Sequence, residues 1–216
     1  ARAHVQGVCV YTISPFHTKE SYVKLAKELE AKGVHSICIK DMSGLLAPYV
    51  AYDLVKALKE AVKLPIELHT HYTSGFGSMT YLKAIEAGVD IVDCALSPFS
   101  LGTSQPCTET MIAALEGTEY DTGLDRAALK PIALHFAGVK KSLSEDFGLK
   151  THFDVDTNVL DFQIPGGMLS NLRNQLKEQG MEDKYQDLLE EMPRVRKDLG
   201  YPPLVTPTSQ IVGSMA

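Results

Sequence analysis

The chain has 216 residues, of which 44% are hydrophobic and 22% are charged, as in an ordinary globular protein. Its 27 acidic residues outnumber the 21 basic ones, the net charge is -6, and no cluster of Lys and Arg indicates nucleic-acid binding. No apolar run approaches the roughly 20 residues that cross a bilayer, and no signal-like segment opens the sequence.

Short apolar runs alternate with helical patterns in the first half of the chain, which is the signature of parallel βα units. The apolar runs predict strands at residues 4–12, 34–40, 65–71 and 89–96. Helical periodicity follows each run, over residues 18–32, from Pro48 onward, over 78–87 and over 107–115. The sequence therefore predicts four consecutive βα units.

A unit of roughly 25 to 30 residues, repeated, is typical of a (β/α)8 barrel. After residue 117 the strand signals weaken, and helical patterns cover residues 125–142, 168–179 and 181–199. We predict an α/β fold, with the second half of a TIM barrel in residues 1–117 and a mostly helical segment in residues 118–216. Because half a barrel leaves strand edges unpaired and its lumen face exposed, we expect a fragment of a longer polypeptide.

The carboxyl ends of the second and third strands carry the residues best suited to chemistry. Side chains alternate along a strand, so Lys40 faces the barrel mouth, and Glu67, His69 and His71 share the lumen face of the next strand. Neutral imidazoles are common ligands of zinc, cobalt or manganese. The pattern predicts a metal site that comprises Lys40, His69 and His71.

Lys40 fits such a site only if it is deprotonated, modified or a substrate contact, because an ammonium group repels a cation. Addition of CO₂ to the neutral amine would form a carbamate, which supplies an oxygen ligand. Plainer interpretations stay open: His69 and His71 can be surface or hydrogen-bonded histidines, and Lys40 a solvated strand end. Glu67 could be a hydrogen-bond partner of a ligand histidine, or it could form a buried pair lower in the barrel. Asp93 could be a polar group of the lumen or a partner of a ligand histidine.

The remaining histidines and the cysteines suggest no further site. We expect structural or surface roles for five histidines, namely His4, His17, His35, His135 and His152. The four cysteines are isolated in the sequence, at Cys9, Cys38, Cys94 and Cys107. This spacing favours reduced thiols over disulfides or a zinc knuckle, so we expect a cytoplasmic protein.

Seven motifs together resemble the carboxyltransferase domain of biotin-dependent enzymes, which include the oxaloacetate decarboxylase alpha subunit, the transcarboxylase subunit and pyruvate carboxylase. In the family's order they are residues 11–18 (YTISPFHT), 37–46 (ICIKDMSGLL), 68–71 (LHTH), 90–93 (DIVD), 103–106 (TSQP), 165–168 (PGGM) and 205–207 (VTP). Residues 14–18 and 101–105 are more similar to the decarboxylase and transcarboxylase branch. The resemblance covers the chain from end to end.

This resemblance implies a metal-centred barrel followed by a helical funnel. Carbamylated Lys40, His69 and His71 would be metal ligands, and the family's further Asp ligand, from the first barrel strand, has no counterpart here. Oxaloacetate would lose its distal carboxyl group at a metal that favours the enolate, and the CO₂ would pass to biotin on a separate carrier domain. Thr206 resembles the family's threonine that contacts biotin and moves a proton between biotin and the enolate; on sequence alone it could equally cap a helix.

The expected partners are a keto acid (oxaloacetate or pyruvate), a biotin carrier domain, further copies of the chain and, for a decarboxylase, membrane-bound subunits. The sequence has no Met-Lys-Met biotin-attachment motif, so the carrier must lie elsewhere. Two other functions stay open. An aldolase-like or acyl-transferring metallolyase would need neither carbamylated Lys40 nor Thr206, and a non-catalytic assembly unit would bind metal weakly or not at all.

Overall fold

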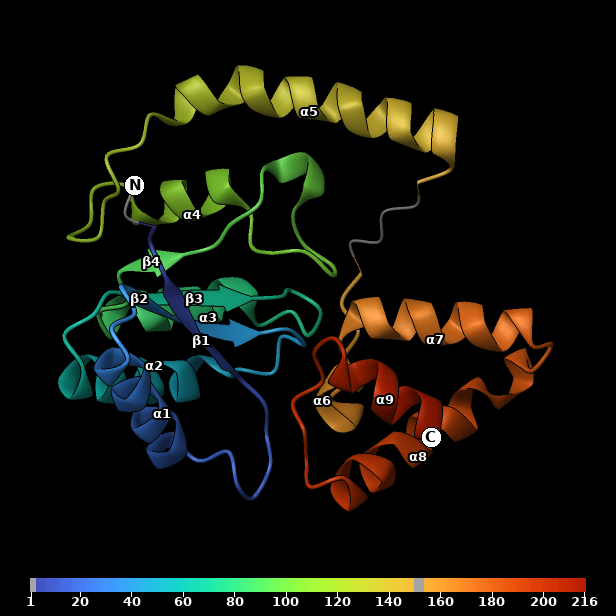
Figure 1. Cartoon of the computed structure of the whole chain (residues 1–216). Helices are drawn as coiled ribbons and strands as arrows, with labels where there is room; N and C mark the ends of the chain where they lie inside the picture. Colours follow the sequence, from blue (N-terminus) through green and yellow to red (C-terminus); the bar gives the residue numbers. More distant parts are fainter. Residues whose placement is uncertain (1–2, 150–153) are drawn as a thin grey trace.

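The computed structural model describes residues 3–149 and 154–216, so His152 lies outside the described residues. Its first part contains β1 (Gln6–Val10), α1 (Lys19–Ala31), β2 (Ser36–Asp41), α2 (Pro48–Ala61), β3 (Ile66–Thr70), α3 (Gly77–Glu86), β4 (Ile91–Val92), η1 (Ser97–Phe99) and α4 (Thr108–Leu115). The strands form one parallel sheet in the order β1-β2-β3-β4 (Figure 1). The predicted α/β class and the four βα units are confirmed.

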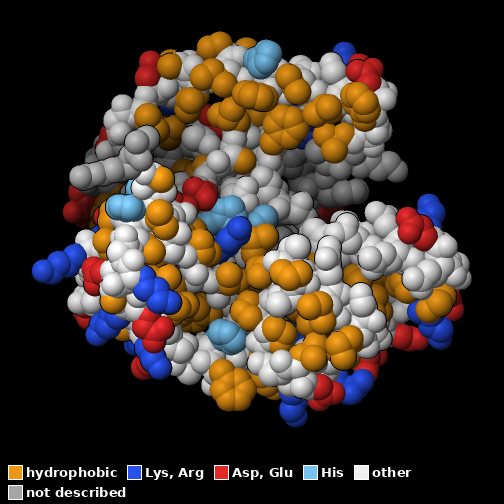
Figure 2. Space-filling model, in the orientation of Figure 1, with side chains coloured by type: hydrophobic (Ala, Val, Ile, Leu, Met, Phe, Trp, Pro, Cys, Tyr) orange, Lys and Arg blue, Asp and Glu red, His pale blue; other side chains and the backbone are white. Residues whose placement is uncertain are grey.

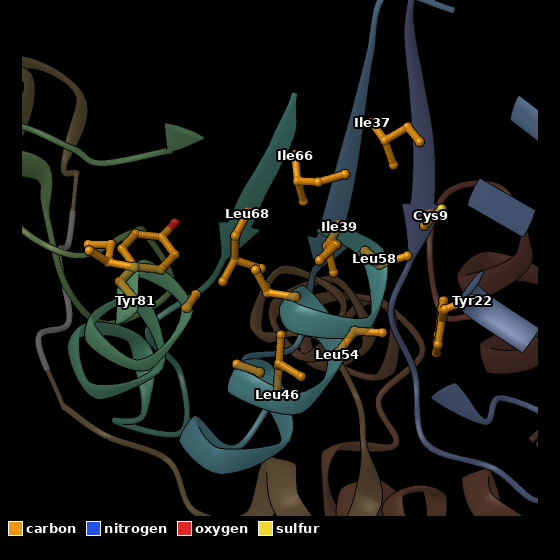
Figure 3. Close-up of a cluster of buried hydrophobic side chains, with 14 of the residues drawn as sticks. Cys9, Tyr22, Ile37, Ile39, Leu46, Leu54, Leu58, Ile66, Leu68 and Tyr81 are labelled. Carbon is orange, nitrogen blue, oxygen red and sulfur yellow. The ribbon is translucent and has the colours of Figure 1, made fainter. Parts of the chain in front are cut away.

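The strand side chains divide between the two faces of the sheet as the alternation predicts. Ile37, Ile39, Ile66 and Leu68 are fully or almost fully buried, and they pack with Leu54 and Leu58 of α2 (Figure 3). Burying each such side chain contributes about 1.5–3 kcal/mol. This apolar core fixes the register of β2 and β3 and therefore turns Lys40 and His69 to the opposite face.

The fourth strand is shorter than the sequence predicts. The apolar pattern extends over residues 89–96, but β4 contains only Ile91 and Val92. Ala95 instead forms an isolated parallel bridge with Cys107, and η1 begins two residues later. The chain leaves the sheet here because Ala95 hydrogen-bonds to the segment that leads into α4.

The second part is helical, as predicted. It contains α5 (Arg126–Phe147), α6 (Asn158–Phe162), α7 (Gly166–Glu178), η2 (Glu182–Lys184), α8 (Tyr185–Asp198) and α9 (Thr208–Met215). A second core, separate from that of the sheet, includes Ile164, Met192 and Val212. The helix α6 was not predicted, α9 was expected only as a helix that Thr206 could cap, and the division between residues 117 and 118 stays a prediction. Among the described residues, no helix combines the length and apolarity that a bilayer crossing needs.

The long helix α5 lies apart from the second core. It contacts α4 and η1, and Lys140 donates a hydrogen bond of 2.6 Å to the carbonyl of Pro98 (Figure 1). Its apolar residues Leu134 and Phe147 are exposed, and hydrophobic side chains are visible along this helix at the top of Figure 2. The helix thus covers the β4 side of the sheet without a buried residue of its own.

A buried arginine joins the helical part to the sheet. Arg196 of α8 is 5% exposed, and neutral oxygens accept from its guanidinium. Its Nη2 donates to Thr12 Oγ1 at 2.6 Å and to the carbonyl of Ile13 at 3.2 Å, just beyond β1. The guanidinium also donates to Gln163, which follows α6, and to the carbonyl of Pro202 at 3.1 Å. One side chain therefore connects three segments that are distant in the sequence.

Replacing this arginine should weaken the attachment of the helical part. Arg196→Met fills a similar volume but leaves buried oxygens without a donor, so we expect the free energy of unfolding to fall by about 3 kcal/mol. Arg196→Lys should not recover this loss, because an ammonium group lacks the planar donor fork. Denaturant titration of the intact protein measures the change. The control is Arg194→Met on the same helix, whose partners Glu191 and Asp198 are surface groups; an equal loss in both variants would contradict the role of Arg196.

Candidate active site

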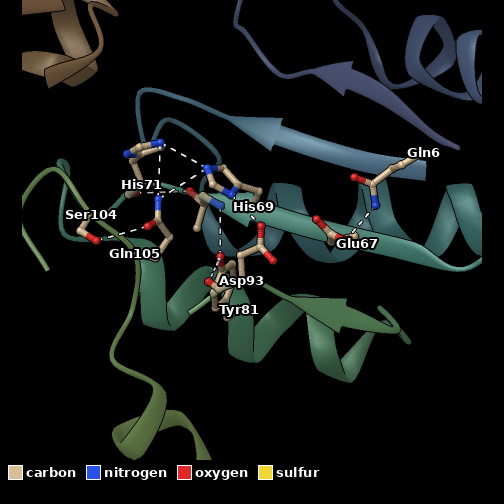
Figure 4. A network of polar contacts seen from close by, with 9 residues as sticks. Gln6, Glu67, His69, His71, Tyr81, Asp93, Ser104 and Gln105 are labelled. Atoms are coloured by element: carbon tan, nitrogen blue, oxygen red, sulfur yellow. Dashed lines mark hydrogen bonds and ion pairs between the residues drawn. The ribbon is translucent and has the colours of Figure 1, made fainter. Parts of the chain in front are cut away.

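Two imidazoles meet at the carboxyl end of β3. His69 and His71 lie on the same side of the extended chain, and their Nε2 atoms are 3.3 Å apart (Figure 4). The Nδ1 of His69 lies 2.7 Å from Asp93 Oδ2, and the Nδ1 of His71 lies 2.6 Å from the carbonyl oxygen of Thr103. Both rings are thus held from behind, with their second nitrogens facing each other.

These contacts determine which ring nitrogens carry protons. A carbonyl oxygen and a carboxylate only accept hydrogen bonds, so each Nδ1 is the donor. In the neutral state both Nε2 atoms therefore present lone pairs to each other. The amide nitrogen of Gln105 is 3.5 Å from both Nε2 atoms, at the limit of a hydrogen bond. Two facing lone pairs are unfavourable unless a proton or a cation lies between them, and this donor set fits a divalent metal ion.

The environment also keeps His71 in the form that binds metals. Partial burial lowers the pKa of His71, and the charges of His69 and Lys40 act in the same direction. The hydrogen bond to Thr103 acts in the opposite direction without reversing the shift. The imidazole is consequently neutral near pH 7.

Lys40 lies next to this pair. It is the register partner of His69 across β2 and β3, and it ends the row of residues on the face opposite the apolar core. Among residues 3–149 and 154–216, no group of three or more His, Cys, Asp or Glu side chains could hold a metal ion. A third protein ligand from the described residues would therefore have to be of another type, and a modified Lys40 is the candidate that the register offers.

A cavity of about 910 Å³ lies between His71 and the helical part. Met42, His71 and Thr103 line one side, and the start of α7 and the segment around Thr206 line the other. Figure 2 shows histidine side chains gathered near the middle of the visible face. The structure thus brings Thr206 and His71 to one cavity, whereas Lys40 and His69 are not among the described residues that line it.

Thr206 does not cap the helix that follows it. The residue before α9 is Pro207, which has no side-chain capping bond. The hydroxyl of Thr208, not that of Thr206, donates to the carbonyls of Pro203 and Val205. Capping therefore does not explain Thr206, whose exposed side chain lies at the cavity.

The loop after β2 is fixed against His71 by two features. The buried carboxylate of Asp41 accepts from the backbone nitrogens of Leu45 and Leu46, at 3.0 and 2.8 Å, and from the hydroxyl of Thr70 at 2.8 Å. Gly44 has a φ of 69°, and a Cβ built on it would lie 2.5 Å from the carbonyl oxygen of His71. Only glycine combines this backbone conformation with this approach.

The other candidate residues are resolved as follows. Glu67 accepts from Gln6 at 2.8 Å, so it takes part in a pair lower on the sheet, and Asp93 is the carboxylate behind His69 (Figure 4). Three of the five remaining histidines have hydrogen-bond partners, which are Ser36 for His4, Ser14 for His17 and the backbone nitrogen of Val5 for His35. The ring of His135 lies against Phe136. The roles of Thr103 and Gln105 were not predicted, although both lie in a motif that the sequence singles out.

Comparison with known families assigns both parts of the chain. The family described as HMGL-like matches residues 10–134, and the family described as a conserved carboxylase domain matches residues 159–216. The first match covers β2, β3, β4 and the histidine pair. The second covers α7 to α9 and Thr206.

Relatives match nearly the whole chain. A pyruvate carboxylase subunit of Methanocaldococcus jannaschii is 61% identical over 214 residues, which are 99% of this chain and 38% of the relative. The methylmalonyl-CoA carboxyltransferase 5S subunit of Propionibacterium freudenreichii is 50% identical over 218 residues, which are 100% of this chain and 43% of the relative. The chain thus spans about two fifths of the length of these relatives.

Solved structures show the same arrangement. The carboxyl transferase domain of Rhizobium etli pyruvate carboxylase is similar with a TM-score of 0.89 and 38% identity, over 97% of this chain and 36% of that one. The same domain with pyruvate and biocytin has a TM-score of 0.88 and 38% identity, over 96% of this chain and 36% of that one. The chain belongs to the HMGL-like family, within the carboxyltransferase domains of biotin-dependent carboxylases.

Proposed function

We propose that the chain forms part of a site that transfers a carboxyl group between a keto acid and biotin. Oxaloacetate and pyruvate are the proposed pair of keto acids, and biotin would be delivered by a carrier domain elsewhere. The observation that carries the proposal is the cavity that both His71 and Thr206 line, with the Nε2 of His71 facing that of His69. The solved relative with pyruvate and biocytin supports the choice of ligands.

We further propose that His69 and His71 hold a divalent metal ion together with Lys40 in carbamylated form. The facing Nε2 atoms, and the acceptors behind both rings, support this donor set. Such an ion supplies Lewis acidity that favours the enolate form of a keto acid. The identity of the metal, the lyase reaction, the cytoplasmic location, the oligomeric state and the membrane-bound subunits stay predictions.

The chain's own residues would orient the two imidazoles and transfer a proton between biotin and the keto acid. Asp93 and the Thr103 carbonyl keep both imidazoles in one tautomer and one orientation. The hydroxyl of Thr206 can donate one proton and accept another, so it suits proton transfer between biotin and the keto acid across the cavity. The walls contributed by α7 and α9 would exclude water from the transferred group.

Isotope exchange on the intact protein tests this function. We expect labelled pyruvate to enter oxaloacetate only when biotin or the biotinylated carrier is present. An absence of exchange under these conditions would overturn the proposal. The HMGL-like match over the sheet also suits a metallolyase that needs no biotin, and exchange that is independent of biotin would favour that second function.

A further inference from the structure

The first residue of α7 lies unusually close to the loop that carries Thr103. A Cβ built on Gly166 would be 2.5 Å from Cγ2 of Thr103 and 3.4 Å from its Cβ. Real Cβ atoms do not approach a neighbour to 2.5 Å, and the β-branched side chain of Thr103 has few χ1 rotamers with which to relieve such a contact. Any side chain at position 166 would have to displace Thr103 or α7.

A second contact shows how tightly α7 is seated. The hydroxyl oxygen of Thr73 would lie 3.5 Å from the same Cβ, and it is inaccessible to water. Within the described part of the chain this oxygen is also the one buried side-chain polar atom that has no hydrogen-bond partner. At Gly166, therefore, the start of α7 lies directly against Thr103 and Thr73.

Thr103 connects this contact to the histidine pair. Its carbonyl oxygen lies 2.6 Å from the Nδ1 of His71, and it is the acceptor that fixes the tautomer of that ring. Gly166 therefore lies against the side chain of Thr103, and His71 is bonded to the carbonyl of the same residue. A shift of Thr103 by a few tenths of an ångström would lengthen or bend this hydrogen bond.

We propose that Gly166 is a positioning residue: its missing side chain lets α7 lie against Thr103, and this contact holds the carbonyl that orients His71. The helical part thereby controls the geometry of His71, just after β3, through Thr103 and without direct contact between Gly166 and the imidazole. This inference deepens the proposed function. It rests on that function only in its metal-binding measurement, which requires the proposed metal site.

A double-mutant cycle in the intact protein tests the coupling. Gly166→Ala introduces the clash, and Thr103→Ser removes the methyl group that it meets while it keeps the carbonyl. The first readout is the imidazole ¹⁵N chemical shift of His71 in metal-free protein, which reports the tautomer. The second is the dissociation constant for Co²⁺. Gly138→Ala on α5 is the matched control, because a Cβ there meets no atom within 4 Å.

In the background that keeps Thr103 we expect Gly166→Ala to move the His71 signals away from the Nδ1–H tautomer and to weaken Co²⁺ binding about 10-fold to 100-fold. In the Thr103→Ser background the same substitution should change neither readout. Helix propensity cannot explain such a loss, because alanine is the better helix former. The control should match the unsubstituted protein.

Two results would overturn the proposal: unchanged ¹⁵N shifts in Gly166→Ala, or equal changes with and without the Thr103→Ser substitution. The two readouts also separate this inference from the proposed function. If the unsubstituted protein bound no Co²⁺, the metal proposal would fail, and the ¹⁵N shifts would still decide whether Gly166 positions His71.

Discussion

His71→Ala is expected to abolish metal retention by the intact protein, and His69→Ala should do the same. Each substitution removes one of the two nitrogens that face each other at 3.3 Å, and among the described residues no group of three or more His, Cys, Asp or Glu side chains could hold the metal instead. The loss should exceed the roughly 10-fold to 100-fold that removal of a supporting hydrogen bond costs. Elemental analysis of dialysed protein, with metal expressed per chain, measures it.

His135→Ala is the control for this experiment. That histidine is exposed on α5, where its ring lies against Phe136, and it is remote from the pair at the end of β3. The unfolding midpoints of all variants should be compared, so that a loss of metal is not mistaken for a loss of fold. A stoichiometric metal in well-folded His71→Ala would exclude the histidine pair as the metal site.

Thr206→Val should remove carboxyl transfer while the metal content stays unchanged. Valine keeps the shape of threonine but cannot donate or accept a proton, so we expect the transfer rate to fall by about 10²-fold to 10⁴-fold. The substitution lies across the cavity from His71, and the side chain of Thr206 makes no cap for α9. Biotin-dependent exchange of labelled pyruvate into oxaloacetate gives the rate.

Thr206→Ser separates the hydroxyl from the rest of the side chain. It should keep most of the transfer rate, because the hydroxyl remains, whereas the valine variant loses it. Normal transfer by Thr206→Val would show that this hydroxyl moves no proton in the reaction. Loss of metal in the same variant would show instead that the substitution disturbs the histidine side of the cavity.

The sheet and its inward and outward faces could be predicted because they depend on local patterns. Alternation alone assigns Ile66 and Leu68 to the core and His69 to the other face, and the structure agrees. The ends of elements were less predictable. β4 is short because Ala95 pairs with Cys107, and the pattern of hydrophobic residues does not predict this contact. The helix α5 continues past residue 142 and ends where Gly148 adopts a left-handed conformation.

Of the candidate site, the sequence could predict the polar residues at the carboxyl ends of the strands. The H-x-H spacing indicates two imidazoles on one face, and the sequence offered Asp93 as one of two alternatives for a partner of a ligand histidine. The acceptors themselves come from two other segments of the chain. Asp93 follows β4, and Thr103 makes its contact through a backbone carbonyl, which the residue type does not reveal. The part played by Gly166 could not be predicted either, since it depends on a distance between two segments that lie far apart in the sequence.

The connection made by Arg196 has a consequence for the order in which the molecule assembles. Its contact with Thr12 spans 184 positions of sequence, whereas the contacts within the βα units are far more local. Loops of that length close late and slowly during folding. During synthesis the strand that carries the two histidines is also made before the helices that carry Thr206. The nascent chain should thus carry the histidine pair on its sheet before the helical part forms the other wall of the cavity.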